Sequence, residues 1–128
     1  MFAYVDADDA HHAACVELLE TRPGPLIVPQ LVVAEVTCFI GRRLGAEPEL
    51  RFLSDLASGL FLTEPVQPAD WLRIGQLVWR YRDLRLGTVD ASVVTVAERL
   101  GLTTIATIDR RHFSVVRPKH TAAFTLLP

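Results

Sequence analysis

The chain has 128 residues, a formal net charge of −2 and a hydrophobic fraction of 50%. This length allows one domain with a single core and leaves no room for a second. The mean hydropathy of +0.27 is high, yet no apolar run approaches the ~20 residues that a membrane-spanning helix requires. We therefore expect the excess of apolar residues to lie in a core or an interface.

Composition also limits where the chain works and what it binds. The N-terminus has no basic segment, apolar stretch or small-residue cleavage site, so we expect a cytoplasmic protein. With an isoelectric point near 6.0, any binding to nucleic acid must rest on local sites. Cys15 and Cys38 stand alone in apolar helical contexts, which predicts buried thiols rather than a disulfide or a zinc site.

The first half of the chain reads as helix, strand, helix, helix and strand. Helices are predicted over 9–20, 30–44 and 48–58, and strands over 26–28 and 60–63. Asp9 is the expected N-cap of the first helix, which the Pro-Gly-Pro sequence at 23–25 ends. Gly45 and Gly59 are expected to end the next two helices.

The second half continues the alternation. A helix is predicted from Pro68, with its apolar face supplied by Trp71, Ile74, Val78 and Trp79. After a loop over 83–88, a helix over 91–100 ends at Gly101, a strand covers 103–108, a turn covers 110–113 and an extended piece covers 124–127. The strand over 103–108 is β-branched and apolar, which is typical of a buried parallel strand. The sequence therefore predicts a three-layer α/β/α sandwich with a mostly parallel sheet.

Glu35 is the first of three acids in unusual surroundings. Its helical neighbours are apolar, namely Leu31, Val32, Cys38 and Phe39, so its side chain is expected to emerge among core residues. A carboxylate buried alone costs several kcal/mol or has a raised pKa, so it usually has a partner or a metal. The alternative is a glutamate at the edge of the core that reaches solvent or pairs with an arginine.

Asp90 and Asp109 are the other two acids in unusual surroundings. Asp90 precedes an apolar helix, where an aspartate is also a common N-cap. Asp109 follows the predicted strand at its carboxyl end, where open α/β sheets place ligand sites, although an Asx-turn leading into Arg110 and Arg111 is the alternative. An α/β sandwich can bring all three acids to one sheet edge.

Carboxylates gathered in this way would repel one another without a cation between them. Oxygen ligands favour Mg²⁺ or Mn²⁺ over zinc. Such a metal polarises a phosphodiester and activates water, so hydrolysis of a phosphate ester is the expected chemistry. Thr88 and Ser92 are candidates for orienting the carboxylate of Asp90.

Three motifs resemble those of the PIN-domain ribonucleases: VAEV around Glu35, LGTVDAS around Asp90 and TIDRRHF around Asp109. TIDRRHF is the most specific, the resemblance covers essentially all 128 residues, and the ordering fits bacterial VapC toxins. In that family four acids, in the order Asp, Glu, Asp and Asp, bind Mg²⁺ or Mn²⁺ and cleave RNA. The resemblance implies that Glu35, Asp90 and Asp109 are the last three ligands.

The first family ligand, an Asp at the end of an opening strand, has no counterpart in this sequence. The opening Met-Phe-Ala-Tyr matches the short helix that follows that strand, and Asp6, Asp8 and Asp9 come later in the pattern. The resemblance therefore predicts an N-terminally short PIN-like domain over 1–128. The strand would be central in the sheet, between the strands over 26–28 and 103–108.

The function we expect is a Mg²⁺- or Mn²⁺-dependent endoribonuclease toxin of a type II toxin–antitoxin system. The resemblance implies a cognate VapB antitoxin, a second copy of the chain and products with a 5'-phosphate and a 3'-hydroxyl. Four basic residues are candidates for contacts with RNA or the antitoxin, or form a solvated face: Arg110, Arg111, Arg117 and Lys119.

Two alternatives stay open at this point. One is a PIN-like remnant that binds antitoxin or RNA without cleaving. The other is a metal-dependent phosphohydrolase that acts on small molecules. The four histidines fall in no metal-ligand spacing, so surface or core roles are expected for His11, His12, His112 and His120.

Overall fold

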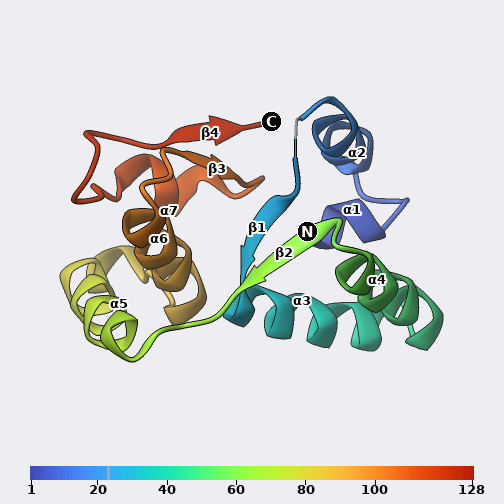
Figure 1. The fold of residues 1–128 in the computed structure, drawn as a ribbon, viewed down its shortest axis with the longest axis horizontal. Helices are drawn as coiled ribbons and strands as arrows, with labels where there is room; N and C mark the ends of the chain where they lie inside the picture. Colours follow the sequence, from blue (N-terminus) through green and yellow to red (C-terminus); the bar gives the residue numbers. More distant parts are fainter. Residues whose placement is uncertain (23) are drawn as a thin grey trace. The chain divides into compact units, whose positions relative to one another are not determined.

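The computed structural model describes residues 1–22 and 24–128, and the chain divides into two units, Met1–Glu64 and Pro65–Pro128. Each unit contains one pair of parallel strands and its own apolar core (Figure 1). Helices connect the strands of each pair, which confirms an α/β fold with parallel strands. Within the described ranges, no helix combines the length and apolar character needed to cross a membrane.

The unit Met1–Glu64 begins with two helices and ends with a strand. Its elements are α1 (Phe2–Val5), α2 (His12–Thr21), β1 (Leu26–Pro29), α3 (Gln30–Arg43), α4 (Ala46–Ser58) and β2 (Phe61–Glu64). Strands β1 and β2 run side by side, with Leu26 opposite Phe61 (Figure 1). The core of this unit consists of Val28, Val36, Ile40, Phe52 and Phe61.

The ends of these helices follow local chemistry. Helix α2 begins three residues after the predicted N-cap Asp9, whose carboxylate instead accepts the backbone N–H of His11 at 2.8 Å. Gly45 and Gly59 have φ of +90° and +82°, which side chains with a Cβ rarely adopt. Gly59 is the C-cap of α4 as predicted, whereas α3 ends at the C-cap Leu44 and Gly45 is instead the N-cap of α4. Of the predicted helix-ending residues 23–25, Pro23 lies outside the described residues.

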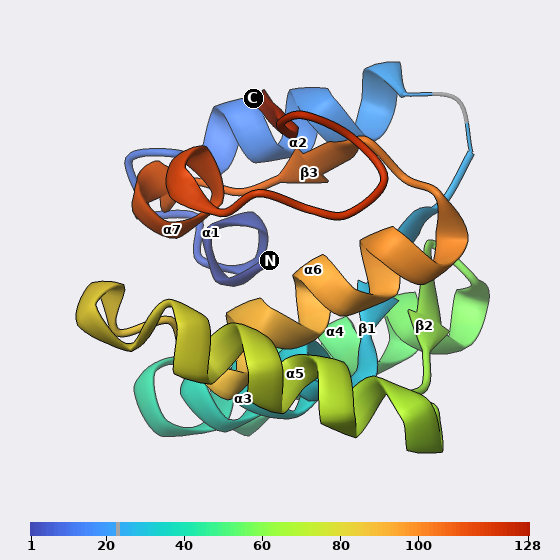
Figure 2. The same ribbon diagram turned by 90° about the vertical axis from the view of Figure 1, so that its left-hand side faces the viewer.

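The unit Pro65–Pro128 contains two long helices packed against each other. Its elements are α5 (Pro68–Arg80), the 3₁₀ helix η1 (Arg82–Leu84), α6 (Thr88–Leu100), β3 (Thr104–Ala106), α7 (Arg110–Val115) and β4 (Thr125–Leu127). Helices α5 and α6 lie side by side in both views (Figures 1 and 2). The apolar core of this unit includes Leu77, Leu86, Val94, Phe113 and Val116.

Buried polar contacts fasten α5 to α6. The carboxylate of Asp70 accepts the N–H of Gln67 at 2.9 Å, which closes a capping box at the start of α5, and pairs with Arg99 at 3.2 Å. Arg73 donates two hydrogen bonds of 2.8 Å to Glu98. The relative position of the two helices is therefore set by ion pairs as well as by apolar packing.

The described strands form two pairs, β1 with β2 and β3 with β4, and both pairs are parallel as predicted. One prediction about packing is wrong. Trp71 and Trp79 were predicted on the buried face of α5, but they are 51% and 70% exposed. Ile74 is buried as predicted, together with Leu77, and the packing of α5 against the core of its unit leaves both tryptophans open to water.

Candidate functional site

Asp90 lies in the first turn of α6. The helix begins at Thr88 with Gly87 as its N-cap, so Asp90 is the third helical residue and the alternative that it is the N-cap is wrong. Its Oδ2 lies 2.5 Å from Nδ1 of His112 on α7. Because an ionised carboxylate only accepts, we assign the proton to Nδ1 of His112. The side chain of Asp90 is 35% exposed and therefore open to a ligand.

Asp109 follows β3 and caps α7. Its carboxylate accepts the backbone N–H of Arg111 at 3.2 Å, which is the local turn that the sequence left open. It also forms a two-point ion pair with the Arg111 guanidinium, with N···O distances of 2.6 and 2.9 Å. These hydrogen bonds lower the pKa of Asp109 to about 2, so the carboxylate is charged at neutral pH while remaining 47% exposed.

The start of α7 therefore joins the two acids. Consecutive residues of this helix, Arg111 and His112, bind Asp109 and Asp90 respectively. The pKa of Arg111 is raised chiefly by Asp109, and the charge of Asp90 adds to this effect. Two accessible carboxylates, each with a side-chain partner on the helix, thus lie around one short helix. His112 was missed from the sequence because its partner is 22 positions away.

Glu35 is placed differently from its prediction. It is exposed on α3, and the buried face of that helix carries Val36 and Ile40. The expectation that core residues surround its carboxylate is wrong, and the alternative in which it reaches solvent describes its position in the unit. Since Glu35 belongs to Met1–Glu64 and the two aspartates to Pro65–Pro128, their convergence on one cation stays a prediction.

The residues predicted to support the site have other contacts. The hydroxyl of Ser92 is buried and donates to the carbonyl of Val89 at 2.6 Å, whereas Thr88 is exposed at the start of α6. The contact that the structure gives to Asp90 is His112.

The four candidate RNA-binding residues are all exposed. Arg110 donates to the carbonyl of Pro128, and Arg117 donates to the carbonyl of Ser114 at 3.0 Å. Lys119 contacts Glu98 through its backbone N–H, which leaves its side chain outside that contact.

The donor chemistry of Asp90 and Asp109 fits a hard divalent cation, because both offer carboxylate oxygens. Over the described ranges no three His, Cys, Asp or Glu side chains gather into a metal-binding group. Two carboxylates alone would leave most positions of a six-coordinate ion to other oxygens. A further acid such as Glu35, or solvent, would have to complete the shell.

The two cysteine thiols are not part of the candidate metal site. Both cysteines are free, and Cys38 is exposed, so its prediction as a buried thiol is wrong. The side of α3 that carries Cys38 faces away from Val36 and Ile40.

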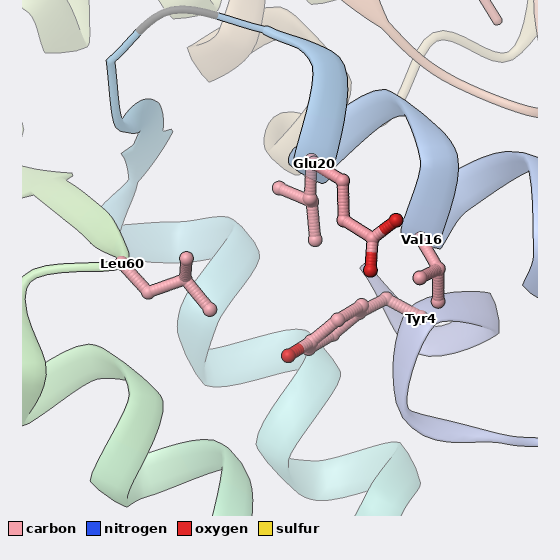
Figure 3. Close-up of a pocket in the computed structure, with 5 residues that line it drawn as sticks. Tyr4, Val16, Glu20 and Leu60 are labelled. Atoms are coloured by element: carbon pink, nitrogen blue, oxygen red, sulfur yellow. The ribbon is translucent and has the colours of Figure 1, made fainter.

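A hollow of about 310 Å³ in the unit Met1–Glu64 is lined by Tyr4, Val16, Leu19, Glu20 and Leu60. Figure 3 shows the Glu20 carboxylate beside the ring of Tyr4, with apolar side chains around them.

Comparison with known proteins identifies the family of the chain. The chain matches the PIN-domain family over residues 1–118, which spans both units. It is 37% identical over 128 residues to ribonuclease VapC26 of Mycobacterium tuberculosis, covering 100% of this chain and 95% of that protein.

A solved structure agrees on the fold. The crystal structure of Mycobacterium tuberculosis VapC20, a toxin described as cleaving the sarcin-ricin loop, matches with a TM-score of 0.75 at 20% identity. The match covers 80% of this chain and 79% of that one. Together with the match over residues 1–118, these similarities show that the chain belongs to the PIN-domain family and is a homologue of VapC-type ribonucleases.

Proposed function

We propose that the chain is a Mg²⁺- or Mn²⁺-dependent endoribonuclease of the VapC type, acting in the cytoplasm as the toxin of a type II toxin–antitoxin system. The observation that carries this proposal is the pair of accessible carboxylates, Asp90 and Asp109, around the start of α7. Similarity to a ribonuclease along the whole chain supports the choice of RNA over a small-molecule phosphate ester.

Asp90, Asp109 and Glu35 are the residues that would hold the cation. A divalent cation there supplies positive charge for the phosphate in the transition state and lowers the pKa of water. The protein's own part is to orient the ligands. His112 engages Oδ2 of Asp90 and so leaves Oδ1 to face a ligand. Arg111 neutralises Asp109 and would compete with a cation for that carboxylate.

The proposed partners are a VapB-type antitoxin and a second copy of the chain. Exposed apolar side chains give both proposals a physical basis, because large apolar groups in water favour association. On α3 and α4 these include Phe39, Leu50 and Leu53. Light scattering of the purified chain at micromolar concentration tests the dimer, and a mass equal to one chain would contradict it.

The test of the enzymatic proposal is cleavage of a labelled RNA by the purified chain with Mg²⁺ or Mn²⁺. We expect Asp90→Asn to reduce cleavage to background because it removes a charged ligand, whereas Asp8→Asn, a matched change at an exposed aspartate, should leave cleavage intact. Circular dichroism of both variants checks the fold.

Three outcomes would contradict the proposal. Cleavage that is unchanged by Asp90→Asn, or by EDTA, would remove the metal-dependent mechanism. If the native chain binds RNA without cleaving it, the chain is a binding module and not an enzyme. Hydrolysis of small phosphate esters with no action on RNA would replace the substrate class.

A further inference from the structure

Trp79, near the end of α5, is 70% exposed, which is unusual for a tryptophan without a partner chain. The guanidinium of Arg82 lies 4.6 Å from the centroid of its ring, and the same guanidinium donates to the carbonyl of Trp79 at 2.9 Å. The indole is therefore held beside a stacked cation while most of its surface stays open to solvent.

Further arginines follow Trp79 in the sequence or lie at Tyr81. Arg80 lies 5.5 Å from the ring centroid of Tyr81, and the Tyr81 hydroxyl accepts the backbone N–H of Arg117 at 3.0 Å. Arg85 follows η1 with φ of +57°, a conformation that glycine or asparagine adopts more easily, so the turn alone does not explain an arginine there. We call this set the basic aromatic patch: Trp79, Arg80, Tyr81, Arg82, Arg85 and Arg117.

The charge of the patch contrasts with that of the chain. The segment 79–85 carries three arginines and one acid, Asp83, whereas the whole protein has a net charge of −2. An acidic protein that binds a polyanion must do so through a local concentration of positive charge. The patch supplies that concentration together with two aromatic rings.

The patch is also connected along the chain to the helices that carry the candidate site. The N–H of Leu86 donates to the carbonyl of Tyr81 at 3.3 Å, and Asp90 follows four residues later in the first turn of α6. On the other side, Arg117 follows α7, the helix that carries His112. Substrate held on the patch would therefore lie along the segments that lead into α6, which carries Asp90, and out of α7, which carries His112.

We propose that the basic aromatic patch binds single-stranded RNA next to the cleavage site, with an unpaired base stacked on Trp79 and the arginines on flanking phosphates. This inference rests on the proposed ribonuclease function and adds the residues that would hold the RNA strand. Base stacking on an aromatic ring needs a base that is free of its helix, whereas arginines contact the phosphates of any strand. The combination selects single strands over duplex.

A protein partner is the competing occupant, because Trp and Arg are also common at protein interfaces. The arrangement favours RNA, since four arginines accompany a single acid and one guanidinium is already stacked on the indole. Apolar anchors such as Leu50 and Leu53 lie outside the patch, in the other unit.

The test measures binding of a fluorescein-labelled single-stranded oligoribonucleotide by anisotropy in EDTA, which prevents metal-dependent cleavage. Trp79→Ala should weaken binding about 5- to 150-fold, the loss measured for stacked bases in other proteins, and Trp79→Phe should restore most of it. Trp71→Ala is the matched control, since Trp71 is an exposed tryptophan of the same helix outside the patch.

Salt dependence and strand form provide independent readouts. Arg82→Ala and Arg85→Ala should each reduce the slope of log K against log salt by about 0.7. The same sequence annealed into a duplex should bind more weakly than the single strand. Circular dichroism checks that each variant is folded.

Each contrary result has a distinct meaning. Three results would overturn the proposal that the patch binds single-stranded RNA. They are unchanged RNA affinity in Trp79→Ala, equal losses of affinity in Trp79→Ala and Trp71→Ala, and equal binding of duplex and single strand. If native protein still cleaves RNA in those cases, the proposed function survives. If Trp79→Ala breaks a dimer and leaves RNA affinity unchanged, the surface is a contact between copies. Native protein that neither binds nor cleaves RNA overturns both proposals.

Discussion

The two units hold their acidic residues in different ways. In Pro65–Pro128, Asp70 is paired with Arg99, Glu98 with Arg73 and Asp90 with His112. In Met1–Glu64, the Arg51–Glu47 pair is exposed, with 67% and 83% of the two side chains open to water, and Glu35 is exposed as well. The C-terminal unit therefore joins its helices α5 and α6 through buried ion pairs, whereas the core of the N-terminal unit is apolar and its Asp55 accepts the Tyr4 hydroxyl at 3.2 Å.

The largest change in stability is expected in the apolar core of the unit Met1–Glu64. Phe52 is fully buried, with its ring centroid 6.0 Å from that of Phe61. Phe52→Ala should destabilise the protein by about 3 to 5 kcal/mol, because it removes apolar contacts and leaves a cavity. Urea unfolding followed by circular dichroism measures the loss.

The same experiment tests whether 1–128 acts as one domain. Both tryptophans, Trp71 and Trp79, lie in Pro65–Pro128, so their fluorescence reports on that unit. In a single cooperative domain, Phe52→Ala should shift the fluorescence and circular dichroism transitions together. A fluorescence transition that stays in place would show two independent domains.

The next effect concerns the buried ion pairs. Asp70→Ala should cost about 1 to 3 kcal/mol, because it removes a helix cap and leaves the buried polar partners without their acceptor. Glu47→Ala removes one partner of an exposed pair and should cost only ~0 to 0.5 kcal/mol. Equal losses in the two variants, measured by urea unfolding, would contradict the proposed difference between the units.

A smaller effect appears in the pH dependence of stability. Burial is the largest influence on Glu98 and raises its pKa, but hydrogen bonds from Arg73 and the backbone N–H of Lys119, together with the charges of those residues, bring the pKa below its usual 4.5. A lowered pKa in the folded state stabilises the protein above the unfolded value, and this stabilisation is lost as pH falls through the folded value.

Glu98→Gln should therefore be less stable than the native chain at pH 7, and the difference should shrink as pH falls below 4.5. Thermal unfolding at several pH values measures it. A difference that is constant from pH 7 to pH 3 would show that the charge of Glu98 does not contribute.

The smallest change in stability is expected at the start of α7. Arg110 and Arg111 are exposed, so replacing both with alanine should leave the melting temperature nearly unchanged. The double variant should bind RNA or the antitoxin more weakly and with a smaller salt slope. A large drop in melting temperature would assign these arginines to folding.

Much of the fold follows from local sequence signals. The helix over 30–44, the glycines that flank α4 and the helix before Gly101 are found within a few residues of their predictions, because capping chemistry and helical periodicity act over a few residues. Strand 103–108 is shorter than predicted, as β3 covers only Thr104–Ala106. Strand length depends on pairing partners, which local patterns do not specify.

The errors at Glu35, at the two tryptophans and at His112 involve residues distant in sequence. Glu35 has apolar neighbours along α3, yet the buried face of that helix is set by packing partners elsewhere. Tryptophans 71 and 79 are apolar but exposed for the same reason. His112 belongs to the site because tertiary structure brings it to Asp90. The local sequence around each acid identified Glu35, Asp90 and Asp109, whereas their contacts depend on the fold.

The most direct test of the account is whether one cation binds acids from both units. Mn²⁺ broadens NMR signals of nearby nuclei, so a substoichiometric titration into ¹⁵N-labelled protein locates the ion. We predict that amides around Glu35, Asp90 and Asp109 broaden together, and that Asp90→Asn weakens the effect at all three. Broadening around Asp90 and Asp109 with no change near Glu35, or no specific broadening at all, would contradict the shared site.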